Sequence, residues 1–181
     1  VVLHPEPRAE LLRDDAGEGV DRLEKGAEAV GEIRDLDAVS GNQEDDHGLA
    51  DHPAERIALV GETLGQVRSV MVEGVSGLLS IHAPADRPHF DVSRNQLKWG
   101  NGTIAQLFAA DDPDSLRGPQ FDAAWCDEFC KWGRAQSAWD NLQLALRLGA
   151  EPQAVVTTTP RNTKALKALL ADPTTVVTRS K

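Results

Sequence analysis

Two neighbouring acids, Asp127 and Glu128, directly follow a short apolar run, Ala-Ala-Trp-Cys, at residues 123–126. Such a run predicts a buried strand, and ligand sites in α/β sheets lie at the carboxyl ends of strands. One carboxylate in that position can hold Mg²⁺, and its neighbour can orient and deprotonate an attacking water. The pair therefore indicates phosphate-bond hydrolysis. The alternative is an ordinary helix start, where acidic residues are electrostatically favoured.

A second polar cluster follows the next apolar run, residues 154–156, about thirty positions later. Thr157, Thr158 and Thr159 stand before Pro160, so their hydroxyls would lie at the tip of a strand. Hydroxyls in that place can bond a γ-phosphate or the water that attacks it. The alternative is a strand end rich in β-formers that a proline closes.

An arginine comes shortly before the first of these two predicted strands, in the turn Ser-Leu-Arg-Gly at residues 115–118. Arg117 could reach a phosphate or act on a neighbouring subunit. The alternative, which we favour slightly, is a surface ion pair with one of the nearby acids Asp111, Asp112 or Asp114.

The elements that must position these residues alternate along the chain from residue 56 onward. Apolar runs and turn signals predict strands at 57–60, 89–92, 121–126, 153–158 and 174–178, and helical spacing predicts helices at 63–72, 135–148 and 163–170. Asn101-Gly102 between residues 96–99 and 103–109 predicts a β-hairpin with a tight turn. This alternation favours an α/β fold with a mostly parallel sheet and helices on both faces.

The net charge of −10 is distributed unevenly. Residues 1–55 carry 16 acids and 5 bases, whereas residues 56–181 carry 13 acids and 14 bases. We expect residues 1–55 to form an acidic, poorly ordered segment and residues 56–181 to form the domain. Charge alone gives the chain no general affinity for DNA. No apolar run approaches the roughly 20 residues of a membrane span, and no signal peptide is evident.

In order and spacing, these motifs resemble the ATPase domain of the large terminase subunit, the DNA-packaging motor of tailed bacteriophages and gene transfer agents. The resemblance covers residues 56–181. It rests on Arg-Ile-Ala-Leu-Val-Gly-Glu-Thr at 56–63, Asn-Gly at 101–102, Ser-Leu-Arg-Gly-Pro at 115–119, Ala-Ala-Trp-Cys-Asp-Glu at 123–128 and Thr-Thr-Thr-Pro at 157–160.

The resemblance implies a P-loop NTPase fold of the RecA/ASCE type, with ATP and Mg²⁺ as cofactors. Asp127 would be the Mg²⁺ ligand, and Glu128 would be the catalytic base, with Arg117 as a second catalytic residue. Thr157–Thr159 would contact the nucleotide and couple hydrolysis to DNA movement. The implied partners are double-stranded DNA, the portal protein, the small terminase subunit and further copies in a ring, in the cytoplasm of a bacterial host and without a membrane.

Two parts of the family's pattern are not found in this sequence. No lysine directly follows a glycine, so a Walker A loop is missing, and the sequence ends before an RNase H-like nuclease domain. We therefore expect an incomplete ATPase domain, a fragment that does not bind ATP effectively and is inactive alone. We also expect the strand at residues 153–158 to lack its family neighbour, so that its edge stays unpaired or residues 174–178 fill the place, because residues 1–55 offer no apolar replacement strand.

Two other functions remain open. The chain could be a fragment of a DExx-type helicase, although a Ser-Ala-Thr motif would then be more usual than a threonine run. It could also be a non-catalytic interaction protein whose acidic residues 1–55 bind a basic partner.

Overall fold

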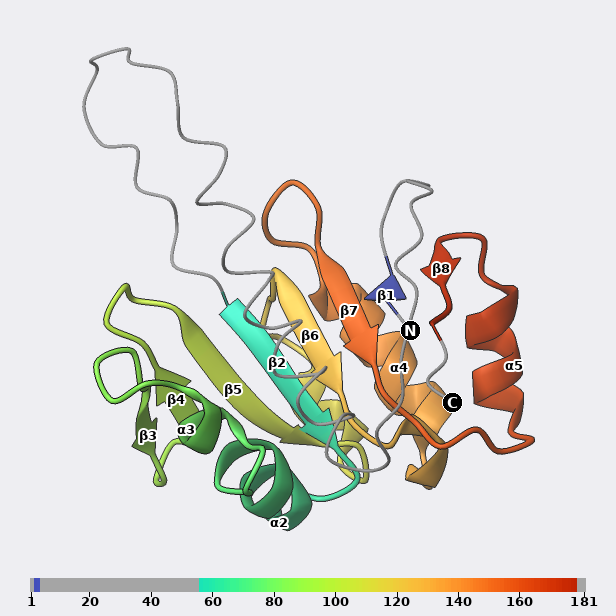
Figure 1. The fold of residues 1–181 in the computed structure, drawn as a ribbon. Coiled ribbons are helices and arrows are strands. Elements are labelled where there is room, and N and C mark those ends of the chain that lie inside the picture. Colours follow the sequence, from blue (N-terminus) through green and yellow to red (C-terminus); the bar gives the residue numbers. More distant parts are fainter. Residues whose placement is uncertain (1, 4–55, 179–181) are drawn as a thin grey trace, which may run out of the picture.

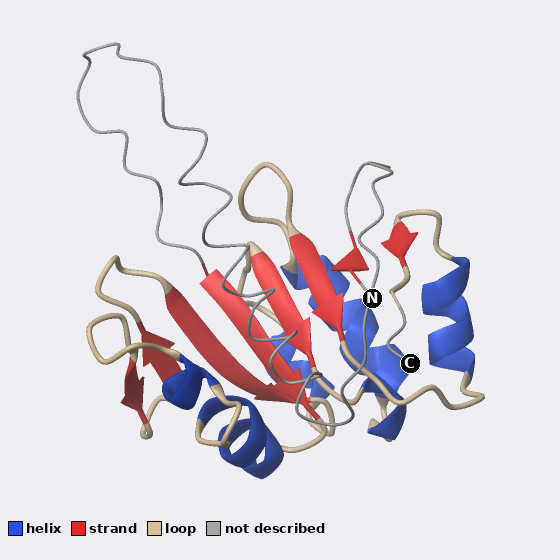
Figure 2. Cartoon of the chain, in the orientation of Figure 1, coloured by secondary structure: helices blue, strands red, loops and turns tan. Residues whose placement is uncertain are grey.

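The computed structural model describes residues 2–3 and 56–178 (Figures 1 and 2). The prediction of a poorly ordered segment over residues 1–55 therefore lies outside the described residues, apart from Val2 and Leu3.

The described strands form one sheet in the order β3-β4-β5-β2-β6-β7-β1-β8. Its four central strands run parallel, and each outer strand pairs antiparallel with its neighbours. The central strands are β5 (Ile104–Ala109), β2 (Arg56–Gly61), β6 (Ala123–Cys126) and β7 (Gln153–Val156), and the outer strands are β3 (His89–Asp91), β4 (Gln96–Lys98), β1 (Val2–Leu3) and β8 (Thr175–Val176). The predicted mostly parallel α/β sheet is confirmed.

Helices cover both faces of this sheet (Figure 1). One face carries α2 (Leu64–Gln66), the π-helix η1 (Val67–Val72) and α3 (Leu78–Ile81), and the other carries the 3₁₀ turns η2 (Pro113–Leu116) and η3 (Phe129–Lys131) with α4 (Ala135–Ala145) and α5 (Lys164–Ala171).

Successive side chains of β2 enter different cores, as a strand buried on both faces requires. Ile57 and Leu59 belong to the core beneath η1, whereas Ala58 and Val60 belong to the core beneath α4. All four are fully buried. The near-continuous apolar run of this strand thus follows from helices packed on both of its faces.

The helix predicted from Thr63 begins there but changes its geometry. The Thr63 hydroxyl accepts a hydrogen bond from the Gln66 amide at 3.3 Å and caps α2. From Val67 the helix continues as the π-helix η1, which buries Val67, Met71 and Val72. The apolar spacing in the sequence predicts a helix but does not distinguish these two helical forms.

The predicted hairpin is present, but its turn differs from the expected tight Asn-Gly turn. Only Gly102 has a positive φ, of 94°, while the Asn101 side chain accepts a hydrogen bond from the Thr103 amide at 3.0 Å. Trp99 donates its amide hydrogen to the Thr103 carbonyl at 3.0 Å, so the loop has three residues. This loop is the kind in which a glycine closes a bulged turn.

The edge of β7 is not left open, which corrects the expectation that residues 1–55 offer no strand for it. Val2 and Leu3 pair antiparallel with Val155 and Ala154. On its other side β1 pairs antiparallel with β8, so the C-terminal strand lies one place further out than expected. Two residues are too short to give a periodic apolar signal, which is why the sequence did not reveal this strand.

Gly77 lies in the turn between η1 and α3, where other backbone atoms come very close to this residue. A Cβ at this position would lie 2.6 Å from the Val72 carbonyl oxygen and 2.8 Å from the Gly74 nitrogen, both backbone atoms that cannot move aside. We expect Gly77→Ala to lower the free energy of unfolding by about 1–3 kcal/mol, measured by urea denaturation. Gly133→Ala is the matched control, because nothing lies within 4 Å of its Cβ. Equal effects in the two variants would contradict the close approach at Gly77.

Candidate functional site at the ends of β6 and β7

The acidic pair and the threonine run meet at one edge of the sheet. Strands β6 and β7 are parallel, and Cys126 is paired with Val156, so the next residues, Asp127 and Thr157, leave the sheet side by side. The Thr157 hydroxyl donates a hydrogen bond of 2.6 Å to Oδ1 of Asp127. The sequence reasoning expected this juxtaposition, and the register of the two strands produces it.

Backbone and indole groups hold Asp127 in place. Its amide donates to the Val60 carbonyl at 2.8 Å, and its carbonyl accepts from Nε1 of Trp132 at 2.9 Å. The residue is 8% exposed. Trp132, which packs in the core beneath α4, thus also fixes the backbone at the acidic pair, because it provides the donor that this buried carbonyl needs.

Glu128 has the left-handed backbone conformation, with φ 55° and ψ 43°. This conformation is uncommon for a residue with a Cβ and costs about 1–3 kcal/mol where the surrounding structure maintains it. It turns the chain sharply from β6 into η3. The Lys131 ammonium lies 3.6 Å from Oε1 of Glu128, an ion pair at spacing i,i+3 that the sequence could have indicated.

Thr158 links the threonine run to the segment after the acidic pair. Its hydroxyl accepts a hydrogen bond from the Cys130 amide at 2.9 Å, and the Phe129 amide donates to the Thr157 carbonyl at 3.2 Å. Thr159 is exposed. Thr157 and Thr158 therefore both contact the segment that begins with Asp127 and Glu128.

Arg117 makes its hydrogen bonds to residues of η2 and α4. Its Nε lies 3.2 Å from Oδ1 of Asp114 and donates to Oδ1 of Asn141 at 3.4 Å. The Arg117 side chain is 70% exposed. The ion pair with Asp114 is the surface pairing favoured from the sequence. Asn141, which the sequence analysis did not consider, is buried and also donates from its Nδ2 to the Pro113 carbonyl at 2.8 Å.

The donor set at this site suits Mg²⁺ better than a metal that needs several protein ligands. Residues 56–178 contain no group of three His, Cys, Asp or Glu side chains that could hold an ion. Mg²⁺ characteristically uses one or two carboxylates and completes its shell with water and substrate phosphates. Asp127, with Glu128 beside it, offers what such an ion takes from a protein.

Cys126, the last residue of β6, is fully buried. Burial raises the pKa of its thiol far above the ordinary value, and the neighbouring Asp127 carboxylate raises that pKa further. The thiol therefore stays protonated and acts as a small apolar group beside the acidic pair.

Comparison with known proteins agrees with this architecture. The family described as "Terminase large subunit, T4likevirus-type, N-terminal" matches residues 40–180. The described residues thus form an α/β domain that corresponds to the N-terminal part of a large terminase subunit. The chain belongs to the large terminase subunit family.

Solved structures of low sequence identity share the fold. The large terminase ATPase domain of Thermus phage P74-26 is 16% identical, with a TM-score of 0.53, and the match covers 84% of this chain and 61% of that one. An arginine-to-alanine mutant of the same domain is 18% identical, with a TM-score of 0.49 and coverages of 85% and 62%. The chain thus spans about 61% of the length of the ATPase domain that it resembles.

A third structure, the large terminase of a thermophilic bacteriophage in complex with ADP, is 15% identical, with a TM-score of 0.47. That match covers 60% of this chain and 26% of the other. None of the curated proteins matches the chain. Within the described part of the chain, no helix has the length and apolar character to span a membrane.

Thr157→Val tests the hydrogen bond that joins the two strand ends. The substitution keeps the shape of the side chain but removes the hydroxyl that donates to the buried Asp127 carboxylate. We expect the free energy of unfolding to fall by about 1–3 kcal/mol, measured by urea denaturation. In the exposed Thr159→Val control we expect a change within about 0.5 kcal/mol. A Thr157→Val variant as stable as the original chain would show that this hydrogen bond contributes nothing.

The buried Cys126 thiol makes the free energy of unfolding depend on pH in the alkaline range. Its folded pKa is raised above the ordinary 9.0, so its contribution is complete below pH 9. Above this pH the unfolded chain loses the thiol proton while the folded chain keeps it, and the free energy of unfolding falls by about 1.4 kcal/mol per pH unit. Urea denaturation between pH 8 and pH 10.5 should show a shallower decline in Cys126→Ala. Parallel declines in the two proteins would refute this assignment.

Proposed function

We propose that this chain supplies the carboxylate-bearing strands of an ATP-driven motor that moves double-stranded DNA into a procapsid. The observation that carries the proposal is the hydrogen bond between Thr157 and Asp127 at the adjoining ends of β6 and β7. Membership of the large terminase family supports a functional role for this arrangement, because the acidic pair and the threonine run are among the motifs by which the sequence resembles these motors.

In this proposal the two acids have different roles. Asp127, buried and held by three hydrogen bonds, holds Mg²⁺, which neutralises charge on the nucleotide phosphates when it is bound. Glu128 follows it in a strained turn and orients the attacking water as general base. The Lys131 ammonium lies 3.6 Å from Oε1 of Glu128.

The threonine run connects the proposed nucleotide site to β7 and α5. Thr157 contacts the proposed metal ligand directly, and Thr158 binds the backbone of the segment after the proposed base. A change at the nucleotide would therefore alter hydrogen bonds to β7 and to the chain that leads through Pro160 into α5. This route would couple hydrolysis to movement of DNA.

For Arg117 we propose a role on a neighbouring subunit in a ring. Its side-chain contacts with Asp114 and Asn141 both use Nε and neither uses a terminal nitrogen of the guanidinium, and the side chain is 70% exposed. Because a guanidinium binds phosphate with a pair of nitrogens, an arginine anchored in this way can receive an anion from outside its own subunit. Portal protein, small terminase subunit and duplex DNA are the further partners that we propose.

We further propose that the chain by itself hydrolyses ATP poorly. No lysine directly follows a glycine in its sequence, so it lacks the loop that surrounds phosphates with backbone N–H groups. The place beside β7, which the resemblance assigns to the strand before that loop, is occupied by Val2 and Leu3 in antiparallel orientation. The helicase fragment and the non-catalytic interaction protein remain the alternatives.

Mn²⁺ is a suitable probe because it accepts the same oxygen ligands as Mg²⁺ and broadens nearby NMR signals. We expect Mn²⁺ to broaden the amide signals of Asp127, Glu128 and Thr157 first, and Asp127→Asn to abolish this selectivity. Asp140→Asn, an exposed change on α4, is the control and should leave the selectivity unchanged. Broadening that is identical in Asp127→Asn would overturn the metal assignment.

The same samples measure ATP turnover. We expect turnover close to background in the original chain and in Glu128→Gln. Clear turnover that disappears in Glu128→Gln would refute the proposed inactivity while supporting the role of Glu128. Turnover that Glu128→Gln leaves unchanged would refute both statements and favour a different catalytic site.

A further inference from the structure

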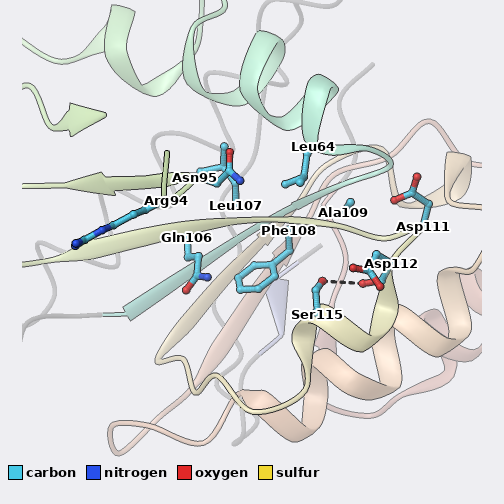
Figure 3. Close-up of a pocket in the computed structure, with 10 residues that line it drawn as sticks. All are labelled: Leu64, Arg94, Asn95, Gln106, Leu107, Phe108, Ala109, Asp111, Asp112 and Ser115. Atoms are coloured by element: carbon cyan, nitrogen blue, oxygen red, sulfur yellow. Dashed lines mark hydrogen bonds between the residues drawn. The ribbon is translucent and has the colours of Figure 1, made fainter. Parts of the chain in front are cut away.

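The outer edge of β5 contains a hollow of about 420 Å³ that is separate from the acidic pair (Figure 3). It lies where β4 stops covering β5. Strand β4 pairs only with residues 104–106, whereas β5 continues to Ala109. Asn95, with a φ of 51°, turns the chain away from the sheet at this point. The last three residues of β5 therefore have a strand partner on one side only, which is β2.

The backbone of β5 presents one donor and one acceptor to this hollow. The Ala110 amide donates toward β2, to the Gly61 carbonyl, whereas the Leu107 amide donates to the opposite side, to the Asn95 carbonyl. Because backbone groups of a strand alternate between its two edges, the Ala109 N–H and the Leu107 carbonyl also face outward. Within the described residues, neither of these two groups has a hydrogen-bond partner.

The side chains around the hollow come from both faces of the sheet. Leu107 belongs to the core beneath η1, and Phe108 belongs to the core beneath α4, yet both line the same hollow. A hollow bounded by both faces surrounds the edge of the strand. It therefore has the shape to receive another extended chain, and the volume is within the range of small-ligand sites.

The charges at the two ends of the hollow differ. Arg94 lies at one end and is paired with Asp91 at 3.7 Å. Asp111 and Asp112 lie at the other end, beyond the carboxyl end of β5 (Figure 3), and neither has an ion-pair partner among residues 56–178. The end near Asp111 and Asp112 is therefore the acidic one.

We propose that this hollow binds an extended peptide segment of a partner protein by strand addition to β5, with basic side chains of that segment against Asp111 and Asp112. The peptide continues the line of β4 and runs antiparallel to β5, so its amino-terminal end lies at the two acids. One of its carbonyls accepts from the Ala109 N–H, and the amide two residues further on donates to the Leu107 carbonyl. Leu64, which is 41% exposed at the rim, contacts an apolar side chain of the peptide. Main-chain bonds supply affinity in this mode of recognition, and side chains supply specificity.

The probe is the peptide acetyl-Lys-Lys-Thr-Val-Thr-Val-amide, labelled with a fluorophore and titrated with the full chain. We expect saturable binding that shifts the NMR signal of the Ala109 amide. The comparison peptide is methylated on both valine nitrogens and on the last threonine nitrogen. It keeps its charges but cannot donate a hydrogen bond to the Leu107 carbonyl. We expect its affinity to be at least ten-fold lower. This comparison leaves the protein unchanged, so it does not depend on the folding of a variant.

Charge is tested on both molecules. We expect Asp111→Asn and Asp112→Asn each to weaken binding about three- to five-fold, the size of an exposed ion pair, and an Asp-Asp peptide in place of Lys-Lys to bind more weakly still. Asp86→Asn, an exposed change in the loop before β3, is the control. Equal binding of the methylated peptide would overturn strand addition. Displacement of the peptide by adenosine or by single-stranded oligothymidylate would overturn the assignment to a peptide.

Discussion

The site depends on the register in which β6 and β7 pair. Because Cys126 lies opposite Val156 in a parallel ladder, each strand delivers its first polar residue to the same point at the edge of the sheet. The hydrogen bond between Thr157 and Asp127 at 2.6 Å is the direct result. A slip of one residue would turn every side chain of the slipped strand to the other face. Burial of both faces of β6 therefore fixes the geometry of the site as well as the core.

The stability of this edge permits a strained residue to persist. Glu128 has a left-handed backbone, yet the residues on both sides of it are held: Asp127 by Val60 and Trp132, and Phe129 by the Thr157 carbonyl. Strain of this kind is retained where the surrounding structure over-determines it. The two adjacent acids lie in different surroundings, because Asp127 is buried and Glu128 pairs with Lys131.

The sequence predicted those parts of the fold that have a local signal. The apolar runs of β2, β6 and β7 and the helices beginning near residues 63 and 135 were expected, because burial and helical spacing are visible in residue types and positions. The helix predicted over residues 135–148 ends earlier, at Ala145. The parts that were missed depend on contacts distant in sequence. The hydrogen bond from the Trp132 indole to the Asp127 carbonyl was missed, since nothing local in the sequence indicates it. The three-residue turn at Gly102 and the pairing of Val2 with β7 likewise depend on tertiary context.

Strand β1 also has a consequence for the order in which the chain can assemble. The C-terminal strand β8 joins the sheet through β1, which is its partner in the described ladder. Val2 pairs with Val155 and with Val176, so this corner of the sheet closes only when segments far apart in the sequence meet. Contacts across such large sequence separations carry a high loop-closure entropy and form slowly. The parallel centre of the sheet can therefore form first, and β8 joins it only after Val2 and Leu3 have paired with β7.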